Sequence, residues 1–280
     1  MKNLQNDVYP ELASVLHQFV ARVQSALECN FIGAYLVGSL ATGDFDLDSD
    51  VDFLVLTKVE LRDADVKSLE AIHSHVHALG SYPAEHLEGS YLTAELLNRP
   101  DAVGVEPVWY LDNGSTTLVL SIHDNRWHVR WILRERGIII TGPDPKTFLP
   151  PISMEALRGE AASSIQELAG QFIAEVDRPI GWFNTRFGQS FAVLTCCRML
   201  HTCASGIVDS KLSSVKWAEQ FLDPGWCGLI RQAWMERREV RFGEKVRQPA
   251  GTDVMHETAH FLAYAVSLTE TSRARPWDDS

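Results

Sequence analysis

Two short apolar runs, separated by a polar loop, dominate the hydrophobic pattern near the start of the chain. Residues 31–37 and 53–57 are rich in β-branched and aromatic side chains and are bounded by turn-forming residues, which predicts two strands. Residues 10–27 repeat apolar side chains every three to four positions, as a helix with one face on a sheet does. The chain is therefore expected to begin with a helix packed against the first strand.

Short apolar runs and helical periods continue to alternate up to residue 143. The pattern predicts helices over residues 63–79 and 126–136, and strands over residues 85–92, 107–111, 117–120 and 137–143. Four prolines between residues 143 and 151 preclude a continuous helix and mark a linker. Beyond the linker only helical spacing recurs, over residues 154–176, 186–204, 212–221, 225–242 and 252–269. The predicted fold is α+β, with an α/β domain containing a mixed sheet over residues 1–150 and an α-helical bundle domain over residues 151–280.

Composition and charge narrow the class of protein. The 280 residues are 45% hydrophobic and 22% charged, as in a soluble globular protein with a substantial core. The net charge of −12 argues against a nucleic-acid partner, because proteins that hold phosphate backbones usually carry a basic face. The pattern contains no membrane-spanning run and no signal-peptide core. Together with five cysteines without paired spacing, it predicts a cytoplasmic protein with no membrane partner.

The loop over residues 38–52 carries the candidate chemistry. Gly38 lets the backbone approach a phosphate closely, and Ser39 offers a hydroxyl and an amide to the same group. Asp50 and Asp52 are two apart at the start of a strand, so their side chains share one face and can reach one metal ion. A carboxylate pair that holds Mg²⁺ beside a phosphate-binding turn is a layout for phosphoryl-type transfer.

The residues of this loop also allow two other interpretations. One is a solvated acidic loop. The other is a calcium loop, because aspartates alternate along residues 44–52. A calcium-binding EF-hand loop needs Gly at its sixth position and Glu at its twelfth, which are Ser49 and Val55 here. This excludes the calcium interpretation.

Two further groups of residues could carry chemistry. Glu88 lies on the third predicted strand and is the natural third carboxylate, although an ordinary charge on a strand face is the alternative. His73 and His77 lie one turn apart on the helix predicted over residues 63–79. Two histidines alone seldom form a metal site, so they are interpreted as part of a solvated helix face.

The pattern of strand, Gly-Ser at residues 38–39, loop and Asp-Val-Asp at residues 50–52 resembles the signature of the nucleotidyltransferase superfamily. In the second half, a leucine-containing helix with Arg198 is followed by a Ser-Gly turn, by Lys211 and by Trp-Ala at residues 217–218. This arrangement is similar to aminoglycoside 3″-adenylyltransferases, which modify streptomycin and spectinomycin. The resemblance covers most of residues 30–245.

The resemblance implies transfer of AMP from ATP with two Mg²⁺ ions. It implies that Asp50 and Asp52 bind the metal and that Glu88 is the catalytic base. It also implies two sets of substrate contacts. Trp109 would contact the drug, and the nucleotide phosphates would be bound by Gly38, Ser39, Ser49, Arg198 and Lys211.

Residues 184–191 depart from the family pattern. The family carries acidic residues here that contact the cationic drug, whereas this stretch contains Asn184 and Arg186 and no carboxylate. A pocket for a polycation would be poorer, because a buried cation needs paired charge. Asn184 could still bind a substrate hydroxyl.

The sequence therefore predicts a monomeric adenylyltransferase that acts on a hydroxyl of a small molecule and releases pyrophosphate. The first candidate acceptor is an aminoglycoside or aminocyclitol antibiotic of the streptomycin and spectinomycin type, a reaction that would confer antibiotic resistance. Another small metabolite or a protein remains an alternative acceptor. A non-catalytic, antitoxin-type nucleotide-binding protein is the alternative from a different class, although the three retained carboxylates argue against it.

Overall fold

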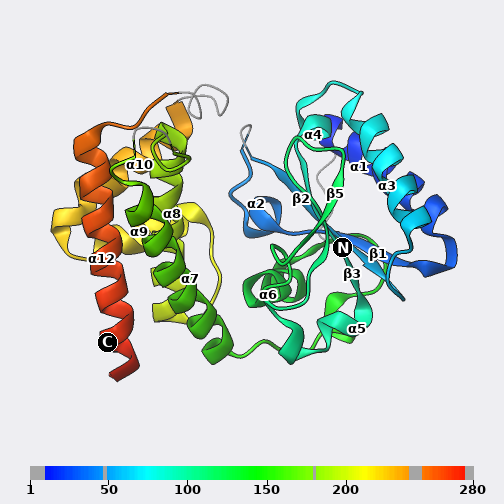
Figure 1. Cartoon of the computed structure of the whole chain (residues 1–280). Coiled ribbons are helices and arrows are strands. Elements are labelled where there is room, and N and C mark those ends of the chain that lie inside the picture. The colour runs from blue at the N-terminus through cyan, green and yellow to red at the C-terminus, as the bar shows by residue number, and fades with distance from the viewer. Residues whose placement is uncertain (1–9, 47–48, 179–180, 240–247, 275–280) are drawn as a thin grey trace. The chain divides into compact units, whose positions relative to one another are not determined.

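The computed structural model describes residues 10–46, 49–178, 181–239 and 248–274. Its contacts divide the chain into two compact units, Met1–Ile152 and Ser153–Ser280. The first unit is built on a sheet and the second is helical (Figure 1). This arrangement confirms the predicted α+β class, with a mixed sheet followed by a helical region.

Six strands form the sheet of the first unit, in the order β5-β4-β3-β2-β1-β6. They are β1 (Phe31–Leu36), β2 (Val51–Thr57), β3 (Leu87–Thr93), β4 (Val108–Leu111), β5 (Leu118–Ser121) and β6 (Ile138–Thr141). β2 and β3 are parallel, whereas every other neighbouring pair is antiparallel. β2 and β3 therefore start at the same edge of the sheet, and the residues at their first positions lie side by side.

Helices pack against both faces of this sheet (Figure 1). The helices are α1 (Pro10–Leu27), α2 (Gly38–Thr42), α3 (Asp63–His77), α4 (Tyr82–Glu85), α5 (Ala94–Leu97) and α6 (Trp127–Arg136), with short 3₁₀ turns η1 (Glu28–Asn30), η2 (Pro100–Ala102) and η3 (Pro145–Thr147). α1 and α3 pack on one face, where Leu16, Phe19 and Leu69 join the strand residues Phe53 and Val55 in one apolar cluster. α2 and α6 lie together on the other side.

His73 belongs to the apolar cluster under α3, so the predicted solvated face is wrong for this residue. Its side chain is buried between Phe19 and Phe53, with ring centroids 5.2 and 5.8 Å away. Nε2 lies 2.8 Å from the hydroxyl of Tyr91. Burial lowers the pKa of His73 to about 3, because the interior disfavours the charged imidazolium. A neutral histidine with one polar partner can occupy an apolar helix position, and residue type alone does not reveal this.

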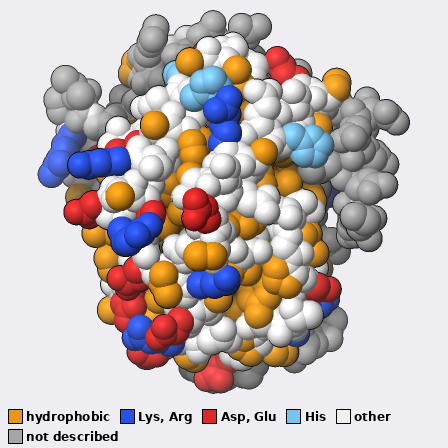
Figure 2. Space-filling view, turned by 90° about the vertical axis from the view of Figure 1, so that its right-hand side faces the viewer, with side chains coloured by type: hydrophobic (Ala, Val, Ile, Leu, Met, Phe, Trp, Pro, Cys, Tyr) orange, Lys and Arg blue, Asp and Glu red, His pale blue; other side chains and the backbone are white. Residues whose placement is uncertain are grey.

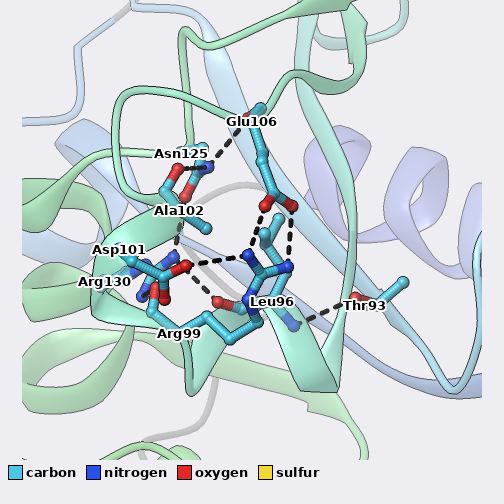
Figure 3. A network of polar contacts seen from close by, with 8 residues as sticks. All are labelled: Thr93, Leu96, Arg99, Asp101, Ala102, Glu106, Asn125 and Arg130. Carbon is cyan, nitrogen blue, oxygen red and sulfur yellow. Dashed lines mark hydrogen bonds and ion pairs between the residues drawn. The ribbon is translucent and has the colours of Figure 1, made fainter.

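A buried arginine anchors the segment that follows β3 (Figure 3). The guanidinium of Arg130, on α6, donates to the carbonyl oxygens of Leu96, Leu97 and Arg99 at 2.9 to 3.2 Å and to Asn125 Oδ1 at 2.9 Å. The amide of Asn125 in turn donates to two further carbonyl oxygens of the same segment, at 2.8 and 2.9 Å. Nearer the surface, Arg99 pairs with Asp101 and Glu106. These contacts fix residues 93–106 and the loop before α6.

The second unit is a bundle around one central helix. Its helices are α7 (Met154–Glu175), α8 (Arg186–Ser205), α9 (Lys211–Phe221), α10 (Cys227–Glu239) and α12 (Thr252–Ala274), with the 3₁₀ turn η4 (Pro224–Trp226). α8 packs against each of the other four helices that the structure describes in this unit. Its small residues Cys196 and Cys197 are buried free thiols in the core of the bundle. Residues 240–242, the end of the helix predicted over 225–242, lie outside the described residues.

Three short helices were not anticipated. α2 occupies the start of the expected loop, and α4 and α5 flank β3 at the two ends of the strand. Each has four or five residues, too few for a helical period to appear in the pattern of apolar positions. The longer elements lie at or within a few residues of their predicted bounds.

Figure 2 shows the face of the first unit on the side where Figure 1 draws α3. Acidic and basic side chains lie among apolar ones there, and several charges of opposite sign are neighbours. Such mixed charge is typical of a solvated surface. Within the described ranges, no helix is long and apolar enough to cross a bilayer.

The Arg130 network generates a stability prediction. Replacing Arg130 with Met would leave several buried carbonyl oxygens without donors, so we expect the free energy of unfolding to fall by on the order of 3 kcal/mol. Urea denaturation of Arg130→Met beside Arg22→Met, an exposed position on α1, measures the difference. Arg130→Lys should not restore stability, because an ammonium cannot reach the same set of carbonyls. Equal stability of the two Met variants would contradict this role.

Candidate active site

Three carboxylates meet where β2 and β3 begin. Asp52 and Glu88 are direct partners in the parallel register, so their side chains leave the sheet on the same face. Asp50 lies two residues before Asp52, immediately before β2. Burial raises the pKa of Glu88 to about 8, and the nearby charges of Asp52 and Asp50 contribute to this rise. The structure therefore brings together the three acidic residues that the sequence singled out.

Gly38 closes one side of this cluster. Its φ of +54° is in the left-handed region, and a Cβ at this position would lie 1.8 Å from Oδ2 of Asp52. Only glycine fits both constraints. The backbone of the turn therefore approaches the Asp52 carboxylate more closely than any other residue type would permit.

Ser39 follows directly and has an unusual hydroxyl. Its Oγ is buried and forms no hydrogen bond with any described residue. A buried hydroxyl without a partner is costly, so an oxygen-rich ligand at this turn would satisfy it. The position of this atom fits the predicted contact with a nucleotide phosphate.

Ser49 is placed differently from Ser39. It is buried, its Oγ donates to Asp46 Oδ1 at 2.7 Å, and the same Oγ accepts from the Asp46 backbone at 3.0 Å. In the structure this side chain closes the loop before Asp50. Its predicted phosphate contact stays a prediction. Residues 47 and 48 of the loop lie outside the described residues.

The hairpin of β4 and β5 supplies contacts to both acidic strands. Tyr110 donates its hydroxyl hydrogen to Glu88 Oε1 at 2.5 Å. Asn113, in the turn of the hairpin, donates from Nδ2 to Asp50 Oδ1 at 2.5 Å and accepts from His86 Nδ1 at 2.8 Å. These contacts orient the carboxylates from outside the loop that carries Asp50 and Asp52.

The segment after β5 adds a histidine and a fourth carboxylate. His123 is exposed, and its Nε2 lies 3.5 Å from Glu88 Oε1. Asp124 is half-buried and accepts a hydrogen bond of 2.7 Å from the hydroxyl of Ser90. Burial raises the pKa of Asp124, against the lowering effects of His123 and Ser90.

Sequence reasoning missed these residues of the hairpin and the segment after it. The residues are Tyr110, Asn113, His123 and Asp124. The available signal was period two along β4, because Tyr110 and Asp112 alternate with the apolar residues of the strand. That signal becomes informative only when β4 is known to pair with β3.

Trp109 lies on the opposite face of the sheet from the carboxylates. It pairs with Tyr91 and packs against the apolar cluster under α1 and α3. Since neighbouring strand residues point to opposite faces, Trp109 and Tyr110 cannot both face the acidic cluster. A substrate held at the carboxylates would meet Tyr110, and the placement of Trp109 does not support the predicted drug contact.

The remaining predicted residues belong to the second unit. Arg198 lies on α8 and Lys211 is the first residue of α9, and their assignment to nucleotide phosphates stays a prediction. Asn184 donates its side-chain amide to the carbonyl oxygens of Glu175 and Arg178. This amide therefore holds the chain before α8, which leaves only its side-chain oxygen for a substrate.

The residues present fit a divalent cation. Asp50 and Asp52 offer the oxygen ligands that Mg²⁺ prefers. Burial is the main cause of the raised pKa of Glu88, and the charges of Asp52 and Asp50 raise this pKa further, so a cation would offset the contribution of the two charges. In the described part of the chain, no group of three or more His, Cys, Asp or Glu side chains forms a complete metal site. Asp50 and Asp52 would thus supply two ligands, and the phosphates of a nucleotide would supply others.

Comparison with known proteins agrees with this geometry. Residues 18–96 match the family described as nucleotidyltransferase domain, a span that includes Gly38, Asp52 and Glu88. No curated protein sequence matches the chain. Among solved structures, a crystal structure of spectinomycin adenyltransferase AAD(9) from Enterococcus faecialis with ATP and spectinomycin is similar, with a TM-score of 0.67 and 16% sequence identity over 91% of this chain and 99% of that chain. The matched domain and the shared fold support a transferase enzyme of the nucleotidyltransferase type.

The Gly38 turn generates a prediction with a matched control. Gly38→Ala and Gly43→Ala both place an alanine at positive φ, but an added Cβ meets nothing within 4 Å at Gly43. We expect both variants to lose about 1 kcal/mol of stability from backbone strain. Only Gly38→Ala should also weaken Mg²⁺-dependent ATP binding, because its Cβ displaces the Asp52 carboxylate. Isothermal titration would measure this, and equal affinities of the two variants would contradict it.

The raised pKa of Glu88 generates a pH prediction. The carboxyl ionises near pH 4.5 in the unfolded chain and near pH 8 in the folded one, so folding binds a proton between these values. Relative to Glu88→Gln, the wild type should lose stability as pH rises from about 4.5 to 8 and should then level off, with a loss of a few kcal/mol. Added Mg²⁺ should reduce this pH-dependent loss of stability in the wild type, because a nearby cation favours the ionised carboxylate.

Thermal unfolding of the wild type, Glu88→Gln and Glu95→Gln across this pH range measures the effect. Glu95 is exposed on α5 and serves as the control. A difference between wild type and Glu88→Gln that does not change with pH would contradict the burial and charge assigned to Glu88.

Proposed function

We propose that the chain transfers AMP from ATP to a hydroxyl group of a small molecule and releases pyrophosphate. The observation that carries this proposal is the parallel register of Asp52 with Glu88, with Asp50 two residues upstream. This register gathers three carboxylates on one face of the sheet, of which Asp50 and Asp52 would bind the metal and Glu88 would accept the proton. The turn at Gly38 and Ser39, which would bind the phosphates, lies against Asp52.

Within this proposal, Asp50 and Asp52 hold Mg²⁺. When bound, Mg²⁺ supplies neutralisation of phosphate charge and polarisation of the reacting oxygens. Gly38 lets the triphosphate approach the backbone, and the Ser39 hydroxyl donates to a phosphate oxygen. Asn113 holds the Asp50 carboxylate in place through its 2.5 Å hydrogen bond.

Glu88 accepts the proton of the attacking hydroxyl. The freed oxygen forms a bond to the α-phosphorus of ATP, and the bond from that phosphorus to the bridging oxygen of pyrophosphate breaks. Burial raises the pKa of Glu88 above that of an ordinary carboxyl, which makes it a stronger base, and a bound cation would favour the ionised form that accepts the proton.

The acceptor that we favour is an aminocyclitol or aminoglycoside antibiotic. The similar solved structure contains ATP and spectinomycin. Four carboxylates in this region, at Asp50, Asp52, Glu88 and Asp124, would favour a cationic acceptor. Arg186, which replaces acidic family residues in the sequence, is paired with Glu236, so its charge is compensated and is less of an obstacle to a cation.

The second unit contributes to the same reaction in this proposal. Arg198 and Lys211 are both half-buried, and as cations they would offset the charge of the nucleotide phosphates. A single copy of the chain, located in the cytoplasm, would be enough to carry out the reaction. The experiment must distinguish this proposal from three alternatives: transfer to a small metabolite, transfer to a protein, and nucleotide binding without transfer.

The decisive experiment is incubation of the purified protein with ATP labelled on the α-phosphate, Mg²⁺ and a panel of aminoglycosides and aminocyclitols. Label on spectinomycin or streptomycin supports the proposal. Label on a protein, or on a hydroxylated metabolite from a cell extract, would show that the acceptor is not an antibiotic. No transferred label, despite tight binding of ATP, would indicate a nucleotide-binding protein instead.

Glu88→Gln separates binding from chemistry. The variant removes the base but keeps the size of the side chain, so we expect ATP affinity to change less than about threefold and turnover to fall by about 10²–10⁴-fold. Isothermal titration beside the labelled-ATP assay measures both quantities. If Glu88→Gln turns over as fast as the wild type, Glu88 is not the base.

A further inference from the structure

The two oxygens of the Glu88 carboxylate have different surroundings. Oε1 accepts the hydroxyl hydrogen of Tyr110 at 2.5 Å and lies 3.5 Å from His123 Nε2. Among the described residues, Oε2 has neither a hydrogen-bond nor an ion-pair partner. One oxygen is therefore held by the protein, and the other is available to a substrate.

Tyr110 itself is held firmly. It pairs with Ser90 on the neighbouring strand, which places it diagonally across from Glu88 on the same face. Its ring is buried and stacks on His123, with centroids 4.9 Å apart and planes 28° apart. The hydroxyl has a second neighbour, Asp112 Oδ1, at 3.2 Å. A phenol has one hydrogen to donate, and the shorter contact assigns it to Glu88.

We propose that Tyr110 is a positioning residue that fixes Oε1 of Glu88, so that Oε2 takes the proton from the acceptor hydroxyl. This inference rests on the proposed function. In the step, the O–H bond of the acceptor breaks and its proton moves to Oε2. The acceptor oxygen bonds to the α-phosphorus, and pyrophosphate leaves with the electron pair of the broken P–O bond.

A glutamate side chain has three rotatable bonds and would otherwise sample several orientations. Nearby, Asp52 and Asp50 repel the ionised form of Glu88, which would drive the carboxylate away from the site where it must act. The Tyr110 hydrogen bond opposes that movement. Because a displacement of about 1 Å can lower a reaction rate 10²-fold, one hydroxyl can have a large effect on turnover without touching the substrate.

Tyr110→Phe tests the proposal because it keeps the ring and removes only the hydroxyl. We expect kcat to fall by about 10–100-fold, with KM for ATP and for the acceptor unchanged. The matched control is Tyr91→Phe. Tyr91 lies on β3, on the opposite face of the sheet, and its buried hydroxyl contacts His73. The control variant loses a buried hydroxyl in the same sheet and should retain the kcat of the wild type.

A double-mutant cycle distinguishes positioning from direct contact with substrate. If Tyr110 acts through Glu88, adding Tyr110→Phe to Glu88→Gln should not lower the residual turnover further. A further 10–100-fold loss in that background would show that Tyr110 acts on the substrate independently and would overturn the proposal. Wild-type kcat in Tyr110→Phe would also overturn it.

A spectroscopic measurement makes the test independent of transferase activity. The ¹³C resonance of the Glu88 carboxyl, assigned by its loss in Glu88→Gln, should shift in Tyr110→Phe and stay in place in Tyr91→Phe. An unmoved resonance in Tyr110→Phe would refute the hydrogen bond. If label transfer is absent in the wild type while this shift is present, the proposed reaction is wrong and the orientation of Glu88 by Tyr110 stands.

Discussion

Repulsion among carboxylates that share one face of a sheet is the constraint around which the first unit is organised. Asp52 and Glu88 are direct partners across parallel strands, and like charges placed directly opposite are destabilising. Several features make this placement tolerable. Asn113 and Tyr110 donate hydrogen bonds to the carboxylates, and Gly38 leaves the space that Asp52 occupies. The unfavourable charge is local, and a metal nucleotide would relieve it.

The rest of the first unit maintains this arrangement. The face opposite the carboxylates packs against α1 and α3, which fixes the register of the strands because a slip by one residue would exchange their faces. On the other side, the Arg130 network ties residues 93–106 to α6 and to Asn125. Asn125 follows the His123–Asp124 pair directly, so this network also determines where those two residues lie.

The sequence predicted much of the fold, because the periods of the longer elements are local properties. It also singled out Asp50, Asp52 and Glu88, which lie together in the structure because two parallel strands that enter a sheet at one edge bring their first residues side by side. It did not identify Tyr110 or show which face of the sheet Trp109 occupies, since both depend on the pairing of β4 with β3. His73 was missed for a similar reason. The sequence does not show that the buried imidazole of His73 has a partner in the hydroxyl of Tyr91, on another element.

One consequence concerns tolerance to insertion and deletion. Exposed hairpin turns usually accept changes in length more readily than the strands that they connect. The turn between β4 and β5 carries Asn113 to Asp50, while the strand that leads into it carries Tyr110 to Glu88. A single added residue there would disturb the hydrogen bonds to both of these carboxylates at once. In related chains this surface turn should therefore keep a constant length, even where its sequence diverges.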